Sequence, residues 1–273
     1  MASTSCWAQP LPCGAARLSA GSAARCPPSI IDIRSRPLGS PSRIVRQQRP
    51  GRSLGLLARG AAQGDQGGSD PTPWSAPGYK GAAVSSMPDT SQAAIVAGIF
   101  AGLGVGTAAS CSLVAPAIAR SLPGFFAFSE STWPLLGVTF LAAGVAHFTV
   151  EQGFLDMYPH RGAWGIYYLP GSPSFHVRWT GVAEVLGGAG LLLGALPLDA
   201  VPGWLEGASA AGLFALTWAV TPANIYMFTH NAPGPVPEDQ ELPVIPPAGH
   251  FARGVLQIFL LSVLWGIATG PHS

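Results

Sequence analysis

Few residues of this chain have side chains that can handle protons or ligands, and most of them lie inside apolar stretches. Within 141–151 the sequence places His147 and Glu151 four residues apart, which puts both on one face of a helix. Such a pair can exchange a proton, or it can form a structural hydrogen bond that anchors the following loop. A metal site needs more than two ligands. The histidines elsewhere in the chain that could join this pair are His160, His176 and His230.

Glu184 and Arg253 each lie near the start of a later apolar stretch. A charged side chain at membrane depth costs at least about 2.5 to 3.5 kcal/mol, so such residues usually face the interior of a helix bundle and find a partner there. We predict that Arg253 pairs with Glu184. Two interpretations of Glu184 remain open, namely an ion pair that holds the bundle together and an acid that contacts a ligand.

Uncharged polar side chains also lie within the apolar stretches. Thr221 and Asn224 lie beside Pro222, which frees a backbone carbonyl; the two side chains can satisfy this carbonyl or line a cavity. Gln257 lies one helical turn after Arg253. No catalytic residue is predicted. The predicted buried polar or ligand-binding cluster consists of His147, Glu151, Glu184, Asn224, Arg253 and Gln257.

These residues are carried by five apolar stretches, at 93–119, 133–150, 180–197, 207–228 and 252–269. A bilayer core about 30 Å thick takes about 20 helical residues to cross. Five such stretches with few polar faces between them favour membrane spans over the buried helices of a soluble protein. The predicted fold is all-α: a transmembrane four-helix bundle at 133–270 with one extra N-terminal hydrophobic helix at 91–120.

The sequence does not determine how two segments are placed relative to the membrane. The first stretch repeats Gly98, Gly102 and Gly106 at every fourth position, a pattern on which helix backbones can approach closely. Because it also contains Pro116, it fits a hairpin or a helix lying flat on the membrane as well. The loop at 155–179 is rich in tyrosine and tryptophan, which predicts an interfacial aromatic belt or a lid over the bundle.

The first 60 residues have the composition of a cleavable leader. Nine of the 14 Lys and Arg residues lie between Arg17 and Arg59, where Asp32 is the only acid. The segment has no apolar run long enough for a signal-peptide core, and its prolines favour a plastid over a mitochondrial transit peptide. Residues 61–90 are rich in Gly and Pro and predict a disordered linker. The predicted location is a chloroplast membrane, either the thylakoid or the inner envelope.

The basic residues of the short loops predict the orientation, because Lys and Arg concentrate on the side that is not translocated. If all five stretches span, one side carries Lys80, Arg161, Arg178 and Arg253, and the other carries Arg120. This distribution places the N-terminus in the stroma and the C-terminus across the membrane.

The composition excludes several classes of function. Of the 273 residues 48% are hydrophobic and 10% are charged, whereas a soluble domain has about 25% charged residues. Beyond the leader the chain is mildly acidic, which argues against a nucleic-acid binder. Cys6, Cys13 and Cys26 lie in the leader, so a mature chain keeps neither a CxxC redox pair nor a thiolate zinc site.

Four motifs resemble, in their order and spacing, the DoxX-like family of integral membrane proteins. They are Leu-Ala-Ala-Gly-Val-Ala-His147-Phe, Arg178-Trp-Thr-Gly-Val-Ala-Glu184-Val-Leu-Gly-Gly, Pro222-Ala-Asn224-Ile-Tyr-Met with His230, and Arg253-Gly-Val-Leu-Gln257. The resemblance covers residues 133–269 and implies a four-helix core to which the first stretch is an addition. The aromatic loop is longer than the family pattern. Some members look like subunits of quinone-linked oxidoreductases, and others have no assigned activity.

The leading interpretation is a plastid membrane protein that either has an accessory or structural role or binds a small lipophilic ligand. The absence of a nucleotide loop, a metal-ligand cluster and redox thiols favours a protein without enzymatic activity. One alternative is a membrane subunit of a quinone-linked oxidoreductase, with a quinone as cofactor and Glu184 and His147 as proton relays. A second is a sterol- or lipid-handling bundle of the EXPERA type, which rests on architecture alone. The expected partners are the lipid bilayer and subunits of a membrane complex.

Overall fold

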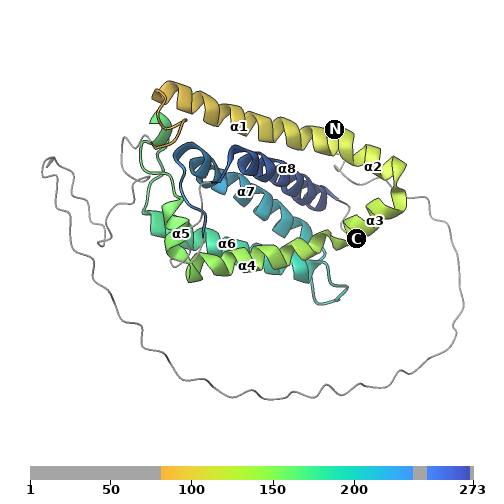
Figure 1. Cartoon of the computed structure of the whole chain (residues 1–273). Helices are drawn as coiled ribbons and strands as arrows, with labels where there is room; N and C mark the ends of the chain where they lie inside the picture. The colour runs from red at the N-terminus through yellow and green to blue at the C-terminus, as the bar shows by residue number, and fades with distance from the viewer. Residues whose placement is uncertain (1–80, 236–244, 271–273) are drawn as a thin grey trace, which may run out of the picture. The chain divides into compact units, whose positions relative to one another are not determined.

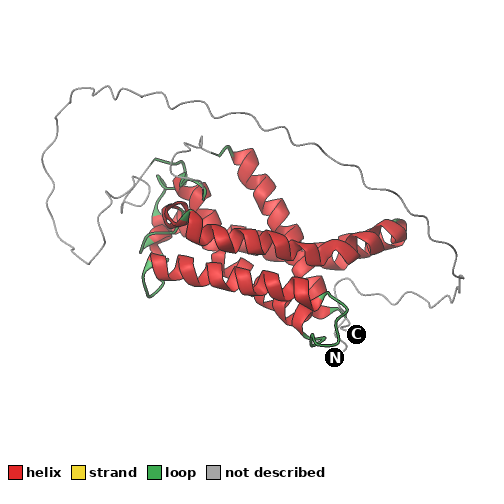
Figure 2. Ribbon diagram, turned by 90° about the horizontal axis from the view of Figure 1, so that it is seen from below, coloured by secondary structure: helices red, strands yellow, loops and turns green. Residues whose placement is uncertain are grey.

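The computed structural model describes residues 81–235 and 245–270, and every regular element in these ranges is helical (Figure 1, Figure 2). The predicted transit peptide and most of the predicted linker lie outside the described residues. In chain order the elements are α1 (Asp89–Ala109), a π-helical turn η2 (Ser110–Val114), α2 (Ala115–Ser121), α3 (Pro123–Thr132), η3 (Trp133–Leu135), α4 (Leu136–Thr149), α5 (Glu151–Asp156), η4 (Ala163–Gly165), α6 (Pro173–Gly194), α7 (Leu205–His230) and α8 (Pro247–Thr269).

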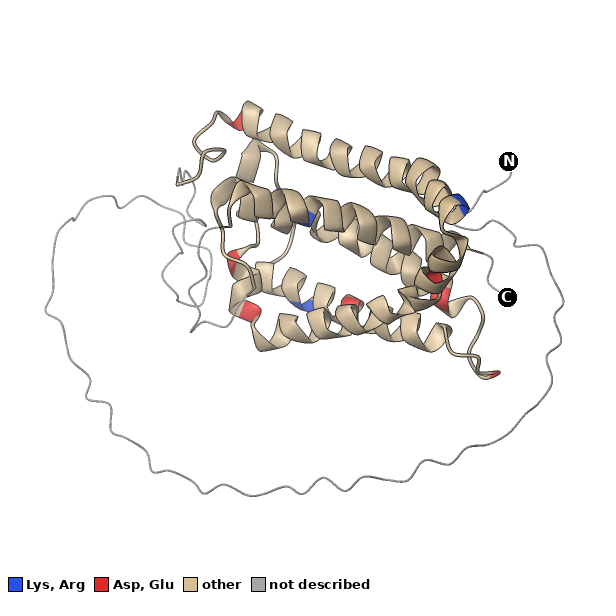
Figure 3. Cartoon of the chain, turned by 45° about the vertical axis from the view of Figure 1, so that its right-hand side comes forward, with Lys and Arg blue, Asp and Glu red and all other residues tan. Residues whose placement is uncertain are grey.

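Four helical segments are long and apolar enough to cross a membrane. They are Asp89–Ser121, Pro123–Thr149, Leu205–His230 and Pro247–Thr269. Charged side chains are sparse along these helices (Figure 3). The all-helical prediction is therefore confirmed for the described residues, and the four segments fit a multi-pass membrane protein.

The predicted stretch at 180–197 is not one of these four segments. It belongs to α6, which begins at Pro173, where the Ser172 hydroxyl caps the helix by accepting a hydrogen bond from the Phe175 N–H. Arg178 and Glu184 lower the hydropathy of this helix. Glu184 is buried where α6 packs against α4 and α7, whereas Arg178 is exposed.

The first apolar stretch forms a continuous helical segment and not a hairpin. α1 passes through the π-helical turn η2 into α2, just before Pro116, which has no N–H to continue the hydrogen-bond ladder. Side chains at Gly98 and Gly102 would meet open space, and only Gly106 of the repeat lies against α8, at Ile258. Within the described chain the glycine repeat is therefore not a continuous packing strip.

α4, α6, α7 and α8 pack side by side in this order, and α1 packs mainly against α8 (Figure 1). One end of this assembly contains the starts of α1, α6 and α8, the ends of α4 and α7, and all of α5; we call it the α5 end. Arg161, Arg178 and Arg253 belong to the α5 end, and Arg120 lies at the opposite end of α2. The helix directions thus agree with the grouping of basic residues that the predicted orientation assumed.

Two pairs of glycines let the backbones of α4 and α6 approach closely. A Cβ atom on Gly144 would lie 2.7 Å from the carbonyl oxygen of Gly181, which is far inside a normal contact distance. Gly137 and Gly188 form the same kind of contact two turns further along. Side chains next to these contacts are held at short range, and among them is His147, which lies one turn after Gly144.

A methyl group at this contact is expected to destabilise the fold. Gly144→Ala must push α4 and α6 apart, so the free energy of unfolding should fall by about 1 to 3 kcal/mol, as overpacking of a close contact does. The matched control is Gly212→Ala in α7, where the added Cβ meets open space. Thermal unfolding of the two variants in the same detergent measures the difference. Equal melting temperatures for the two variants would contradict the close contact.

Candidate functional site

The six residues predicted as one polar cluster fall into separate contacts. The contacts are His147 with Glu184, Glu151 with Arg178, Arg253 with Asn224, and Gln257 with Thr221. The predicted ion pair between Arg253 and Glu184 is wrong, because the recorded partners of Arg253 are neutral and the ion-pair partner of Glu184 is His147. The predicted residues do form polar contacts, but the packing of the helices gives them other partners than the predicted ones.

His147 and Glu184 form a buried pair between α4 and α6. The Nδ1 atom of His147 lies 2.7 Å from the carbonyl oxygen of Val177, and since a carbonyl only accepts, Nδ1 carries a proton and donates it. The other ring nitrogen, Nε2, lies 3.5 Å from Oε2 of Glu184. This Oε2 atom is buried and makes no hydrogen bond to the described residues. A proton carried by either Nε2 or Oε2 would therefore lie between these two atoms.

The predicted face shared by His147 and Glu151 is interrupted in the structure. α4 ends at Thr149, and Val150, with φ −130° and ψ 44°, breaks the helix before α5 begins at Glu151. Glu151 instead accepts two hydrogen bonds from the exposed Arg178 side chain, at 2.9 and 3.1 Å. This pair links α5 to α6 at the surface, so Glu151 takes no part in the buried proton pair.

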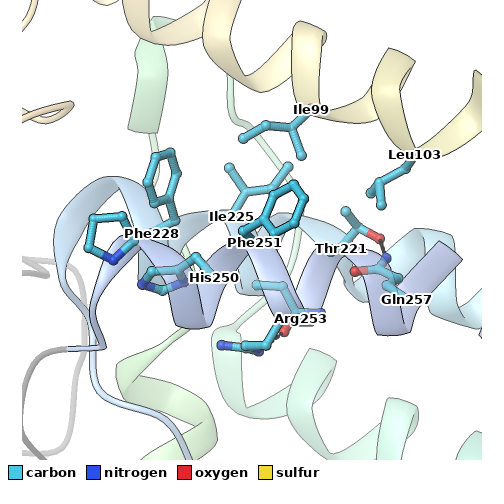
Figure 4. A pocket seen from close by; sticks show the side chains of 12 residues that line it. Ile99, Leu103, Thr221, Ile225, Phe228, His250, Phe251, Arg253 and Gln257 are labelled. Carbon is cyan, nitrogen blue, oxygen red and sulfur yellow. Dashed lines mark hydrogen bonds between the residues drawn. The ribbon is translucent and has the colours of Figure 1, made fainter. Parts of the chain in front are cut away.

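A cavity of about 370 Å³ lies between α1, α7 and α8 (Figure 4). Apolar side chains from all three helices make up most of its wall, and Thr221, Asn224, Arg253 and Gln257 supply polar groups. Three of these four residues belong to the predicted cluster. Small-molecule sites commonly have this make-up, with a mainly apolar wall and a few polar groups that fix orientation. The remaining lining residues are Ile99, Leu103, Ile225, Phe228, Pro247, His250, Phe251 and Gly254.

Arg253 joins α8 to α7 at this cavity. One of its terminal nitrogens donates to Oδ1 of Asn224 at 2.6 Å, and the other contacts Sδ of Met227 at 3.0 Å. Because Oδ1 accepts from the arginine, the Asn224 amide nitrogen keeps its own N–H groups, which have no partner among the described residues. The arrangement presents hydrogen-bond donors and a positive charge.

Gln257 and Thr221 form a second polar link between α8 and α7. The Thr221 hydroxyl donates to the carbonyl oxygen of Thr217 at 2.8 Å, so its oxygen accepts from the Gln257 amide nitrogen at 2.7 Å. The carbonyl oxygen of the Gln257 side chain is then the atom left to accept a hydrogen bond from a ligand. The sequence pointed to these residues, but it gave no sign that α1 supplies Ile99 and Leu103 to the opposite wall.

A polar and aromatic cluster at the α5 end was not predicted as a unit. Trp164 is 3% exposed and donates from Nε1 to the Thr229 hydroxyl at 2.9 Å, with a left-handed backbone at φ 57°. His160 lies 2.9 Å from the Tyr226 hydroxyl, and the His230 ring stacks on Tyr226 at 4.2 Å between centroids. This part of the aromatic loop is a lid that plugs the bundle. The signal in the sequence was the richness of this loop in tyrosine and tryptophan, which did not show which of its residues are buried.

Other aromatic residues of the same loop match the belt interpretation. Tyr168, Phe175 and Trp179 are exposed, as side chains that meet the interfacial region of a bilayer would be. Arg161 lies over the ring of Tyr168, 4.2 Å from its centroid. The loop therefore has a buried part that packs as a lid and an exposed part on which an interfacial belt stays a prediction.

The histidines considered as further metal ligands lie apart from His147. His160 and His230 belong to the lid cluster, and His176 contacts the carbonyl oxygen of Pro170. Within 81–235 and 245–270 no three His, Cys, Asp or Glu side chains come together as a metal site would require.

Burial sets the protonation of the loop residues in this lid. It lowers the pKa of His160, which favours the neutral imidazole that bonds to Tyr226. It also raises the pKa values of Tyr158 and Tyr167, which keeps both phenols protonated at neutral pH.

No family model, curated protein or solved structure matches this chain. The resemblance to the DoxX-like family therefore stays a prediction, and the case for a function rests on the geometry above.

The lid should loosen in acid. The folded protein holds the His160 pKa below its ordinary value of about 6.5, so an unfolded chain takes up a proton there before the folded one does. The melting temperature should fall as the pH drops below about 6.5 and level off below the folded pKa. His160→Gln should make this fall smaller without abolishing it, because His230 lies in the same cluster, 5.6 Å away between ring centroids. An unchanged pH profile in the variant would contradict a role for His160.

Proposed function

We propose that this chain is a multi-pass chloroplast membrane protein of the DoxX-like type that binds a small lipophilic ligand between α1, α7 and α8. The observation that carries the proposal is the cavity of about 370 Å³, whose wall is mainly apolar and carries the polar side chains of Thr221, Asn224, His250, Arg253 and Gln257. A ligand that enters such a cavity from a bilayer needs apolar bulk and at least one polar group. The four membrane-capable segments support the membrane setting.

The DoxX-like assignment is supported by where its motif residues lie. His147, Glu184, Asn224 and Arg253 fall on α4, α6, α7 and α8 respectively, and these four helices are neighbours in that order. In this proposal they form the family's four-helix core, and α1 is the added helix that supplies the outer wall of the cavity. The Arg-rich, acid-poor first 60 residues support import into a plastid, with the thylakoid and the inner envelope as the candidate membranes.

Filling the cavity should abolish ligand binding without unfolding the protein. Gly254 lines the cavity, and a Cβ atom added there meets open space, so Gly254→Leu extends a side chain into the ligand volume. Leucine is also a better helix former than glycine, by up to about 1 kcal/mol. Gly212→Leu in α7, whose Cβ also meets open space, is the matched control outside the cavity.

Native mass spectrometry of protein purified from plastid membranes in mild detergent provides the measurement. The wild type and Gly212→Leu should carry a bound small molecule that Gly254→Leu lacks, while all three have similar melting temperatures. A wild type that is empty in every preparation, and that takes up no added amphiphile, would overturn the proposal.

A second candidate function is a membrane subunit that passes protons to or from a quinone-linked partner. The observation that favours it is the buried pair of His147 and Glu184, whose Nε2 and Oε2 atoms face each other at 3.5 Å. A carboxyl group that faces a neutral imidazole nitrogen can hand over its proton with little movement of either side chain.

Glu184→Gln tests this second function, because the amide keeps the shape of the side chain but cannot release a proton. The variant should accumulate normally in the membrane while quinone-dependent activity of the complex is lost. The control is Glu151→Gln, which removes an acid of the surface pair at the same end of the protein. Loss of accumulation in Glu184→Gln with full specific activity of the remaining protein would assign the pair to structure alone.

A further inference from the structure

The positive charge of Arg253 has no negative partner in the described part of the chain. The ion pairs found there are His147 with Glu184 and Arg178 with Glu151. Arg253 is half-buried, and its two recorded contacts are with an amide oxygen and a thioether sulfur, neither of which carries a charge. The C-terminal end of α7 adds only a partial negative charge near Asn224 and Met227. A cation in this position favours a bound anion.

The cavity is polarised from one side to the other. Ile99 and Leu103 project from α1 on one side, and Arg253 lies on the opposite side, with Ile225 and Phe251 between them (Figure 4). The free donors of Arg253 and of the Asn224 amide lie together on the polar side. A ligand that matches this arrangement carries its acceptor oxygens at one end and apolar bulk at the other.

Depth along the helices gives the same orientation. Arg253 lies about 9 Å along the axis from Pro247, where α8 begins. Leu103 lies about 21 Å along α1 from its start at Asp89. Both helices start at the α5 end, so Arg253 lies nearer to this end of the bundle than Leu103 does.

We propose that the ligand of this cavity is an anionic amphiphile, whose carboxylate, phosphate or sulfonate head binds Arg253 and Asn224 and whose acyl chain lies against Ile99 and Leu103. This inference rests on the proposed function and specifies its ligand. A neutral quinone fits less well, because its carbonyl oxygens can accept hydrogen bonds from the arginine but leave its charge uncompensated, whereas a carboxylate or phosphate accepts two parallel hydrogen bonds and also neutralises the charge. The free acid of a lipid and the headgroup of an intact anionic lipid share this chemistry.

The test compares ligands that differ only in charge, on the full chain in neutral-lipid nanodiscs. Oleate, methyl oleate, phosphatidylglycerol and decylubiquinone are each titrated against the wild type, and binding is read from native mass spectra and from quenching of intrinsic tryptophan fluorescence. Oleate should bind at least about ten-fold more tightly than methyl oleate, because the two share one chain and only oleate offers a carboxylate. Phosphatidylglycerol binding in place of oleate would assign the site to intact membrane lipid instead of a free fatty acid.

Substitutions of Arg253 then test whether its positive charge binds the ligand. Arg253→Gln should weaken the binding of the anionic ligand by about ten- to a hundred-fold, while Arg253→Lys keeps most of it. Arg178→Gln, which removes a cation of the exposed surface pair at the same end, is the control and should bind as the wild type does. The ligand comparison on the wild type stands even if Arg253→Gln fails to fold.

The outcomes separate this inference from the proposed function. Equal binding of oleate and methyl oleate, tighter binding of decylubiquinone, or unchanged oleate binding in Arg253→Gln would overturn the anionic ligand while the cavity remains a binding site. If none of the four probes binds, or if Gly254→Leu binds them all as well as the wild type does, the cavity is not a ligand site and both proposals fail.

Discussion

The contact between the backbones of α4 and α6 determines how this protein arranges its polar residues. Because Gly144 meets Gly181 and Gly137 meets Gly188, the two helices lie closer together than any pair of side chains would allow. His147 follows Gly144 by one turn, so its ring lies directly against α6, where Val177 fixes its tautomer and Glu184 faces its second nitrogen. The buried pair of His147 and Glu184 is therefore a consequence of the close glycine contacts between α4 and α6.

The same packing explains why α6 can carry charged groups. A helix with Arg178 near its start and Glu184 one and a half turns later is poorly suited to face lipid, and it is not one of the four segments apolar enough to span on composition alone. Its contacts with α4 and α7 cover Glu184, while Arg178 remains exposed at the α5 end with Glu151. A polar helix is stable in a membrane when protein covers its polar positions.

The cavity exists because α1 and α7, unlike α4 and α6, are not in close contact. α1 contacts α8 and the lid but makes few contacts with α7, so a space remains between the three helices. Trp164, held by its hydrogen bond to Thr229, connects the lid to the end of α7, and the lid in turn packs on α1. These contacts fix one end of α1, and the apolar side chains of α1 then close the outer wall. α7 therefore contacts the lid at its end and lines the cavity along its length.

The sequence by itself determined the helical class, the positions of the longest helices and most of the residues that form the site. Because runs of apolar residues indicate burial or contact with lipid, the segment from α1 to α2 and the helices α4, α7 and α8 were predicted within a few residues. The shorter α3 and α5 were not predicted, and α6 begins seven residues before its apolar stretch. The sequence did not determine the partners. Arg253 was paired with Glu184 because opposite charges near membrane depth attract, but the glycine contacts assign Glu184 to His147 and leave Arg253 beside Asn224.

Only the tertiary structure decided that a break at Val150 removes Glu151 from the face of His147, that part of the aromatic loop enters the bundle, and that α1 completes a cavity. These features arise from packing between residues that are distant in the chain. Local periodicity carries no information about which face of one helix meets which face of another. The sequence shows which side chains can bind protons or ligands. Helix packing determines which of them are in contact, and therefore which hydrogen bonds and ion pairs they form.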